Sequence, residues 1–128
     1  MGIFSSIFES NNNEKDKKVF NWIPLTETSQ LKEIVELSKD KLVVIFKHST
    51  RCGISSGVIS QFEKAIDTTS ETSFFYYLDL IRYRNLSNEI AHFFNVQHQS
   101  PQVILLKNGE VINYASHYDI ISKLIDEI

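Results

Sequence analysis

Residues 41–55 read KLVVIFKHSTRCGIS, and the interpretation of the whole chain starts from this stretch. Residues 41–47 form a continuous apolar run of strand length, which predicts a strand covered on both faces. After Cys52 the apolar residues recur every four positions, which predicts a helix that begins at or near the cysteine. These residues are Ile54, Val58, Phe62 and Ile66. The only thiol of the chain is therefore expected at a helix amino terminus, just beyond a central strand.

Two other segments before residue 82 have the composition of strands. The stretch VFNWI, 19–23, is short, β-branched and aromatic, and Pro24 is expected to end it near a sheet edge. The stretch SFFYYLDLI, 73–81, is a second apolar run. Its neighbouring aromatic residues resemble a base-stacking surface, but aromatics in a buried strand are more often core, and we interpret them as core.

The carboxyl-terminal third predicts a hairpin. Asn108-Gly109 is a strong signal for a two-residue turn, so the segments that flank it should be antiparallel strands. They cover residues 102–107 and 110–115. Ser116 followed by Asp119 resembles a capping box before a closing amphipathic helix over 120–128.

Two further helices complete the order. Thr28 is the expected cap of the first, which has an apolar face, and the second spans about 87–94. The apolar face consists of Leu31, Ile34, Val35 and Ser38. The sequence thus predicts an α/β fold of order β-α-β-α-β-α-β-β-α, with a central mixed sheet flanked by helices. We expect one domain over 19–128, after a flexible tail and linker over 1–18.

Composition limits the function classes. The chain has 128 residues, a formal net charge of −3 and a pI near 5.8, so it has no basic field for nucleic acid. The apolar patch in MGIFSSIFES is too short to span a membrane or to form a signal-peptide core. One cysteine forms no internal disulfide, which favours a reducing cytoplasm. We expect a cytoplasmic monomer without a nucleic-acid or membrane partner.

The position of Cys52 favours a reactive thiol over the inert buried cysteine that a lone thiol more commonly is. Amide groups and the dipole at a helix amino terminus favour the thiolate form. Lys47, His48 and Arg51 would add positive charge, although Arg51 fits a solvent-exposed side chain equally well. Ser55 cannot take part in thiol exchange, so a second thiol must come from outside the chain. Its hydroxyl is also expected to satisfy a backbone group in the first helical turn.

The remaining histidines are weaker candidates. His48 and His98 could border the same groove, but His98 fits better as a packed or surface histidine, and His48 stays open between the two interpretations. His92 and His117 are interpreted as structural. A zinc site from Cys52 and histidines lacks the ligand spacing and a second cysteine, so no metal site is expected.

Two stretches of the sequence carry a resemblance to known proteins. Cys52-Gly53-Ile54-Ser55 after a strand, followed by SPQVILLKNGEV from Ser100, resembles the thioredoxin fold over most of 19–128. FKHSTRCGIS together with HQSPQVILLKNG resembles the bacilliredoxin family of the YtxJ type, monothiol proteins of the bacillithiol system. The resemblance implies that Cys52 attacks a mixed disulfide and that Pro101 is a cis-proline facing it. It also implies that backbone groups near Ser100 pair with a docked substrate.

Some residues depart from the thioredoxin pattern. Phe46 stands where thioredoxins carry a buried acid, and Arg51 stands where they carry tryptophan, which argues against their dithiol proton relay. Gly53 makes the motif partly similar to the CGFS of monothiol glutaredoxins. An iron–sulfur cluster-binding module therefore remains an alternative, although no lysine-bearing loop of that class is recognisable before Cys52. A redox-inert thioredoxin-fold adaptor is a third possibility.

The leading hypothesis is a monothiol thiol-disulfide oxidoreductase that removes bacillithiol from protein mixed disulfides. Cys52 is the expected catalytic residue, and the residues around it form the expected groove. The groove residues are Lys47, His48, Arg51, Gly53, Ser55, Ser100 and Pro101. No cofactor is expected to be bound, and bacillithiol acts as co-substrate. The partners are bacillithiolated proteins, and a low-molecular-weight thiol or a partner reductase that clears Cys52.

Overall fold

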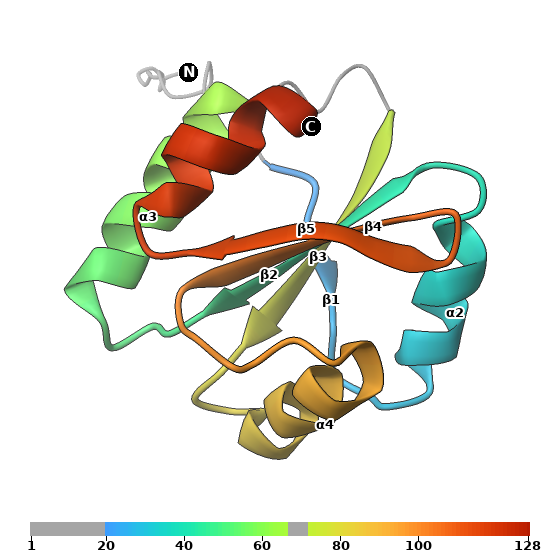
Figure 1. The fold of residues 1–128 in the computed structure, drawn as a ribbon. Coiled ribbons are helices and arrows are strands. Elements are labelled where there is room, and N and C mark those ends of the chain that lie inside the picture. Colours follow the sequence, from blue (N-terminus) through green and yellow to red (C-terminus); the bar gives the residue numbers. More distant parts are fainter. Residues whose placement is uncertain (1–19, 67–71) are drawn as a thin grey trace, which may run out of the picture.

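The computed structural model describes residues 20–66 and 72–128, and within them a five-stranded mixed sheet forms the centre (Figure 1). The strand order is β1-β3-β2-β4-β5. Strands β1, β3 and β2 run parallel, whereas β4 and β5 are antiparallel. The strands are β1 (Ile23–Pro24), β2 (Leu42–His48), β3 (Ser73–Asp79), β4 (Gln102–Lys107) and β5 (Glu110–Ser116). The predicted α/β class with a mixed sheet is confirmed. The predicted tail and linker, 1–18, lies outside the described residues.

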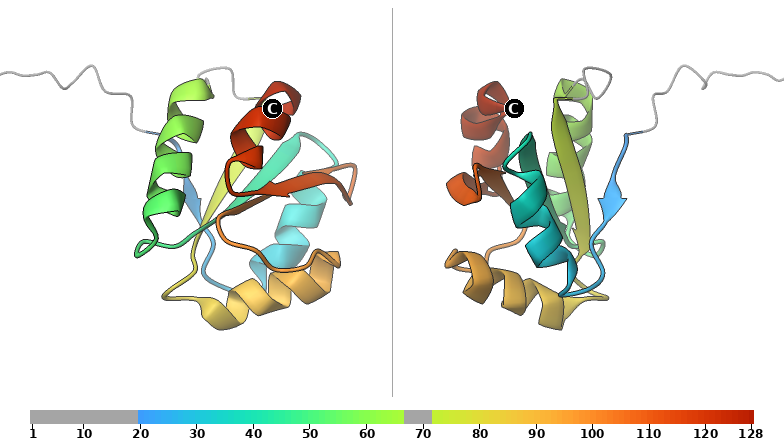
Figure 2. Two further views of the ribbon diagram at one scale, coloured as in Figure 1. Left: turned by 60° about the vertical axis from the view of Figure 1, so that its left-hand side comes forward. Right: turned by 90° about the vertical axis from the view of Figure 1, so that its right-hand side faces the viewer.

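Helical elements cover both faces of this sheet (Figure 2). They are α2 (Gln30–Leu37), α3 (Gly53–Ala65), α4 (Arg84–Phe94), a π-helical turn η2 (Ile120–Leu124) and a 3-10 turn η3 (Ile125–Glu127). One core cluster joins α3 and η2 to the sheet through Val58, Phe62 and Ile120. The other joins α2 and α4 to the opposite face through Ile34 and Ile90. The sheet is therefore the middle of three layers.

Strand β2 lies in the centre of the sheet and is buried along its whole length, as its apolar run predicts. Side chains alternate between the two faces of a strand. Val44 and Phe46 accordingly pack in the cluster under α3, whereas Val43 and Ile45 pack in the cluster under α2 and α4. The same alternation sends the last two side chains of the strand, Lys47 and His48, to opposite faces of the sheet.

The hairpin prediction is confirmed. Asn108 and Gly109 connect β4 to β5 with positive φ angles of 57° and 83°, the backbone that a two-residue turn of this kind requires. Ser38 at the end of α2 holds the turn. Its carbonyl accepts a hydrogen bond from the Asn108 amide at 2.7 Å, and its Oγ accepts one from the Gly109 amide at 2.8 Å.

The prediction for the first strand is wrong in its bounds. The strand covers Ile23–Pro24 instead of 19–23, so Pro24 is its second residue and does not end it. β1 is an edge strand that pairs only with β3, and a proline without an amide hydrogen is tolerated there. Trp22 belongs instead to the aromatic core under α3, where it stacks on Phe62 with ring centroids 5.9 Å apart.

Helix ends also differ from the predictions. Ser29, not Thr28, is the N-cap residue of α2, and Gln30 Oε1 accepts the amides of the preceding turn. The helix predicted around 87–94 begins three residues earlier, at Arg84. Ile54 lies on the solvent side of the first turn of α3, 45% exposed, and does not join the apolar face.

The predicted closing helix is present, but as a π-helical turn followed by a 3-10 turn. Ser116 is the last residue of β5, and Asp119 makes no side-chain capping hydrogen bond, so the predicted capping box is absent from this part of the described chain. The backbone continues as the π-helical turn η2 and the 3-10 turn η3. Ile120 and Leu124 are fully buried against the sheet, which is the contact that the apolar pattern predicted.

Candidate active site

Cys52 is the N-cap residue of α3, in an extended conformation with φ −107° and ψ 121°. Its amide donates a hydrogen bond to the Ser49 carbonyl at 3.2 Å, and its own carbonyl accepts the first helical bond from Ser56 at 3.0 Å. The residue is partly exposed, and the Cys52 side chain makes no capping hydrogen bond. A free thiol thus lies at the amino end of a helix, directly after the central strand, as predicted.

Ser55 lies one turn into α3 and is fully buried. Its Oγ accepts a hydrogen bond from the Ser49 amide at 3.1 Å and lies 2.8 Å from His48 Nδ1. The hydroxyl therefore satisfies a backbone group, as predicted, and also holds a buried imidazole. Burial lowers the pKa of His48, while the charges of Asp79 and Glu63 act in the opposite direction.

Lys47 lies on the other face of the sheet, in a place that the sequence prediction did not foresee. The side chain is fully buried, and its Nζ lies 3.3 Å from the Ser87 carbonyl and 3.3 Å from His98 Nδ1. No hydrogen bond joins Lys47 to Cys52 among the residues described. Lys47 and His48 are consecutive, yet they serve two separate polar clusters.

Pro101 and Ser100 lie at the same end of the sheet as the thiol. Gln102, the first residue of β4, pairs with Lys47 near the end of β2, so the residues just before Gln102 lie beside the segment that leads to Cys52. The Ser100–Pro101 peptide bond is cis. The Ser100 Oγ is buried and has no hydrogen-bond partner in the described structure.

Arg51 and Gly53, on either side of the thiol, are both exposed. A Cβ atom built on Gly53 would meet no heavy atom within 4 Å, so the surface beside Cys52 is open. Arg51 forms no ion pair within the described residues, which fits the solvent-exposed alternative. The structure therefore leaves an accessible approach to the sulfur.

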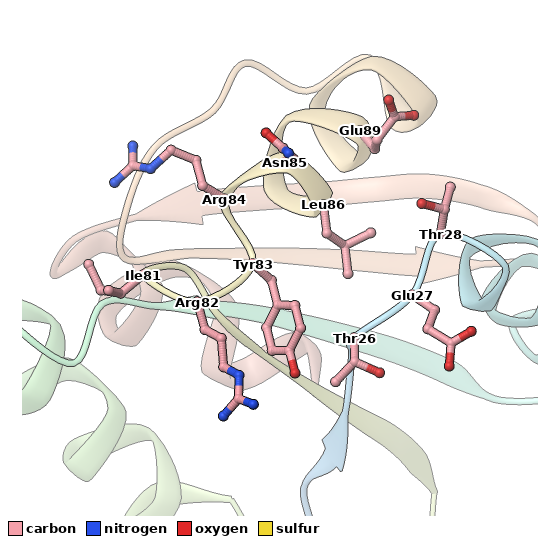
Figure 3. Close-up of a pocket in the computed structure, with 10 residues that line it drawn as sticks. All are labelled: Thr26, Glu27, Thr28, Ile81, Arg82, Tyr83, Arg84, Asn85, Leu86 and Glu89. Carbon is pink, nitrogen blue, oxygen red and sulfur yellow. The ribbon is translucent and has the colours of Figure 1, made fainter.

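A cavity of about 700 Å³ lies nearby, at the carboxyl ends of β1 and β3 (Figure 3). Arg82 and Arg84 lie on one side of it, and Glu27 and Glu89 lie on the other. None of the predicted groove residues lines this cavity. The turn that forms its wall is tied to the end of β2, because the Leu80 amide donates to the His48 carbonyl at 2.9 Å.

Two contacts in this region were missed by sequence reasoning. The pairing of His48 with Ser55 spans a loop whose course the sequence does not specify, and Ser87 had no motif around it. The signal for Lys47 was present: a lysine one residue before the end of a buried strand must point into one of the two cores. Alternation alone would have separated Lys47 from His48.

The described residues contain neither a candidate metal site nor a membrane-spanning helix. Within 20–66 and 72–128, no group of three or more histidine, cysteine or acidic side chains is arranged to hold a metal ion. No helix in these same ranges combines the length and the apolar character needed to cross a membrane.

Solved structures of thioredoxin-fold proteins share the fold of this chain. A protein described as a candidate oxidoreductase with a thioredoxin fold is 34% identical, with a TM-score of 0.69 over 82% of this chain and 91% of that chain. Thioredoxin from Schistosoma mansoni is 25% identical, with a TM-score of 0.61 over 84% and 94% of the two chains. Thioredoxin from Trypanosoma brucei brucei is 20% identical, with a TM-score of 0.65 over 84% and 87%.

The fold and the thiol at the start of α3 thus define a thioredoxin-like thiol oxidoreductase. The sequence model of one family, monothiol bacilliredoxin BrxC, matches residues 23–125, which is nearly the whole described chain. The chain belongs to the monothiol bacilliredoxin family.

Proposed function

We propose that this protein removes bacillithiol from protein mixed disulfides by thiol exchange at Cys52. The observation that carries the proposal is the pairing of a partly exposed thiol at the start of α3 with a fully buried serine three residues later. The first feature supplies a nucleophile, and the second leaves no internal thiol to compete for the product. The family match supports bacillithiol as the small thiol.

The first step is a displacement at sulfur. The Cys52 thiolate attacks the bacillithiol sulfur of a protein–S–S–bacillithiol disulfide, so that a new S–S bond joins Cys52 to bacillithiol. The bond to the protein sulfur breaks, and the released protein thiolate takes a proton from water. The open surface at Gly53 gives a bulky protein disulfide access to the sulfur.

The second step needs a thiol from outside the chain. Ser55 Oγ is bonded to Ser49 and His48 and has no sulfur chemistry, so the Cys52–bacillithiol disulfide persists until another thiolate arrives. A second bacillithiol would attack it, releasing bacillithiol disulfide and the Cys52 thiolate. A partner reductase with its own thiol would release free bacillithiol instead.

This cycle sets the working conditions that we propose. One chain suffices, so the protein acts as a monomer, and bacillithiol is a co-substrate with no further bound cofactor. Each step begins with attack by a thiolate and releases another, so the cycle needs a compartment that keeps thiols reduced, such as the cytoplasm.

The test is release of the small thiol from one protein prepared in bacillithiolated and glutathionylated forms. The parent protein should release bacillithiol faster than glutathione, and Cys52→Ser should release neither while keeping the parent circular dichroism spectrum. Ser56→Ala, which alters an exposed serine in the same turn of α3, is the matched control and should match the parent. Retained release by Cys52→Ser would overturn the proposal.

The two alternatives predict different results in the release experiment and in two further measurements. A cluster-binding module would show visible absorption and labile iron after anaerobic purification, with slow release of both thiols. An inert adaptor would show neither colour nor release, and its Cys52 would be alkylated at the rate of an ordinary thiol.

A further inference from the structure

A buried cationic cluster lies beside the active-site end of the sheet, and the thiol exchange described above does not use it. Lys47 Nζ contacts the Ser87 carbonyl and His98 Nδ1, each at 3.3 Å, and Ser87 Oγ lies 3.2 Å from the same ring nitrogen. Lys47 and Ser87 are fully buried. Within the described residues no carboxylate forms an ion pair with Lys47. A buried ammonium without a counter-ion is costly.

The cluster requires one protonation state of His98. A lysine ammonium has three donors and no acceptor, so the contact at 3.3 Å needs an unprotonated Nδ1 on His98. The Ser87 hydroxyl can donate to the same nitrogen. A proton on Nδ1 would remove the acceptor and place two positive charges side by side, so the neutral ring holds the cluster together and the charged ring opposes it.

The cluster also connects three elements. Lys47 belongs to β2 and Ser87 to α4, whereas His98 belongs to the segment 95–101 between α4 and β4, which ends at Pro101 and is called the proline loop below. One further side-chain bond holds this loop, from Gln102 Nε2 to the Gln97 carbonyl at 2.9 Å. The proline loop lies at the same end of the sheet as the thiol, and the family resemblance implies that its backbone groups near Ser100 pair with the docked substrate.

We propose that Lys47 and His98 are positioning residues that hold the proline loop in its substrate-binding position, and that protonation of His98 releases it. The proposal rests on the proposed function for its consequence in substrate binding. Its structural part, a loop fastened by a neutral histidine to a buried lysine, stands on the contacts alone. Binding of the protein mixed disulfide should therefore weaken at acid pH, while exchange at Cys52 in the bound complex should change less.

The charged groups around His98 favour its neutral form at neutral pH, and this form accepts the hydrogen bond from Lys47 that holds the proline loop. Burial lowers the pKa of His98, and the positive charges of Lys47 from β2 and Arg84 from α4 lower it further. The ring is then neutral at pH 7 and gains its proton at a lower pH than an ordinary histidine does. Burial also lowers the pKa of Lys47 to about 8, so the ammonium is still mostly charged at pH 7 and donates to the neutral ring.

The test compares two substitutions of His98 in the full chain. His98→Asn keeps an acceptor near the position of Nδ1 but cannot be protonated, whereas His98→Leu removes the acceptor. Between about pH 7.5 and about pH 5.5, KM of the parent for a bacillithiolated protein should rise several-fold, and His98→Asn should lack most of this rise. His98→Leu should have a KM raised about tenfold at every pH, with kcat changed less, as expected for the loss of a charge-assisted hydrogen bond.

A second variant separates positioning from stability. Lys47→Met removes the buried charge and fills its space, a change that often stabilises a fold. It should raise KM although the melting temperature does not fall, a combination that a merely structural lysine would not give. His92→Asn, which alters an exposed histidine of α4, is the matched control and should keep the parent pH profile. The proposal is overturned if His98→Asn retains the acid-side rise in KM.

A measurement without substrate distinguishes a failure of this proposal from a failure of the proposed function. Amide hydrogen exchange of residues 95–100 should be faster in the parent than in His98→Asn at about pH 5.5, and equal in the two at about pH 7.5. If the parent releases no small thiol but the exchange difference appears, the proposed function fails and the fastening of the loop stands. Equal exchange at both pH values would refute the fastening itself.

Discussion

The Ser55 hydroxyl makes hydrogen-bonding contacts with two groups, and replacing the serine with alanine would remove both contacts. Ser55→Ala would leave the buried His48 Nδ1 and the partly buried Ser49 amide without their partner. An unsatisfied buried polar group costs about 1 to 3 kcal/mol, so the free energy of unfolding should fall by about 2 kcal/mol. Denaturant unfolding measures it, with the exposed Ser56→Ala as a control that should change little. An equal loss in the two variants would contradict the role of the buried hydroxyl.

Ser55→Cys should change the reaction as well as the stability. A thiol at this position would follow Cys52 by three residues, as in dithiol exchange proteins, and could attack the Cys52–bacillithiol disulfide. We expect the variant to release bacillithiol without an added thiol and to accumulate an internal disulfide, detected as a loss of two hydrogens by intact mass. Persistence of the Cys52 adduct would mean that the buried position is closed to this attack.

Lys47 should make stability depend on alkaline pH. Its pKa is about 8 in the folded protein against 10.5 for an ordinary lysine, so the unfolded chain binds more protons between these values. Stability therefore rises with pH across this window, by as much as about 3 kcal/mol. Denaturant unfolding from about pH 8 to about pH 10 should show this rise in the parent relative to Lys47→Met. The same pH dependence in both proteins would contradict the burial of an unpaired ammonium.

At the scale of the element, replacing either of two glycines with alanine should change the free energy of unfolding, in opposite directions at the two positions. Gly109 has φ 83°, where a Cβ is strained even though its neighbours leave room, so Gly109→Ala should lower the free energy of unfolding by about 1 kcal/mol or more. Gly57 lies inside α3, and its added Cβ would meet only Tyr118 Oη, at 3.9 Å. Gly57→Ala should raise stability by about 0.5 to 1 kcal/mol. A stabilised Gly109→Ala would contradict the turn geometry.

The elements that the sequence predicted well are those with a strong local cause. The apolar run of β2, the Asn108-Gly109 turn and the repeat after Cys52 each specify one backbone conformation, and the structure has all three. The predictions were wrong where tertiary packing, and not local sequence, determines the backbone conformation. Pro24 pairs at a sheet edge because β3 is beside it, and the last residues form π-helical and 3-10 turns while they bury Ile120 and Leu124.

The candidate site was also predictable only in the part that has a local cause. Placing Cys52 needed only the strand before it and the repeat after it. The partners of Lys47 could not be predicted from local sequence, because Ser87 and His98 come from other elements that fold onto the same face of the sheet.

At the scale of the whole molecule, the fold brings the thiol and the proline loop to one end of the sheet. The parallel strands β1, β3 and β2 all point their carboxyl ends to this side, and β4 begins there because it is antiparallel to β2. Ligands of open α/β sheets characteristically bind outside the carboxyl ends of such strands. The position of the site thus follows from the topology of the sheet.

The most direct test of the central claim is the intact mass of the protein after a single turnover with an equimolar bacillithiolated protein, quenched by alkylation. The account predicts one bacillithiol added to this chain at Cys52, and an unmodified thiol on the released protein. A disulfide between the two proteins, or bacillithiol left on the substrate, would contradict the claim that the Cys52 thiolate takes the small thiol.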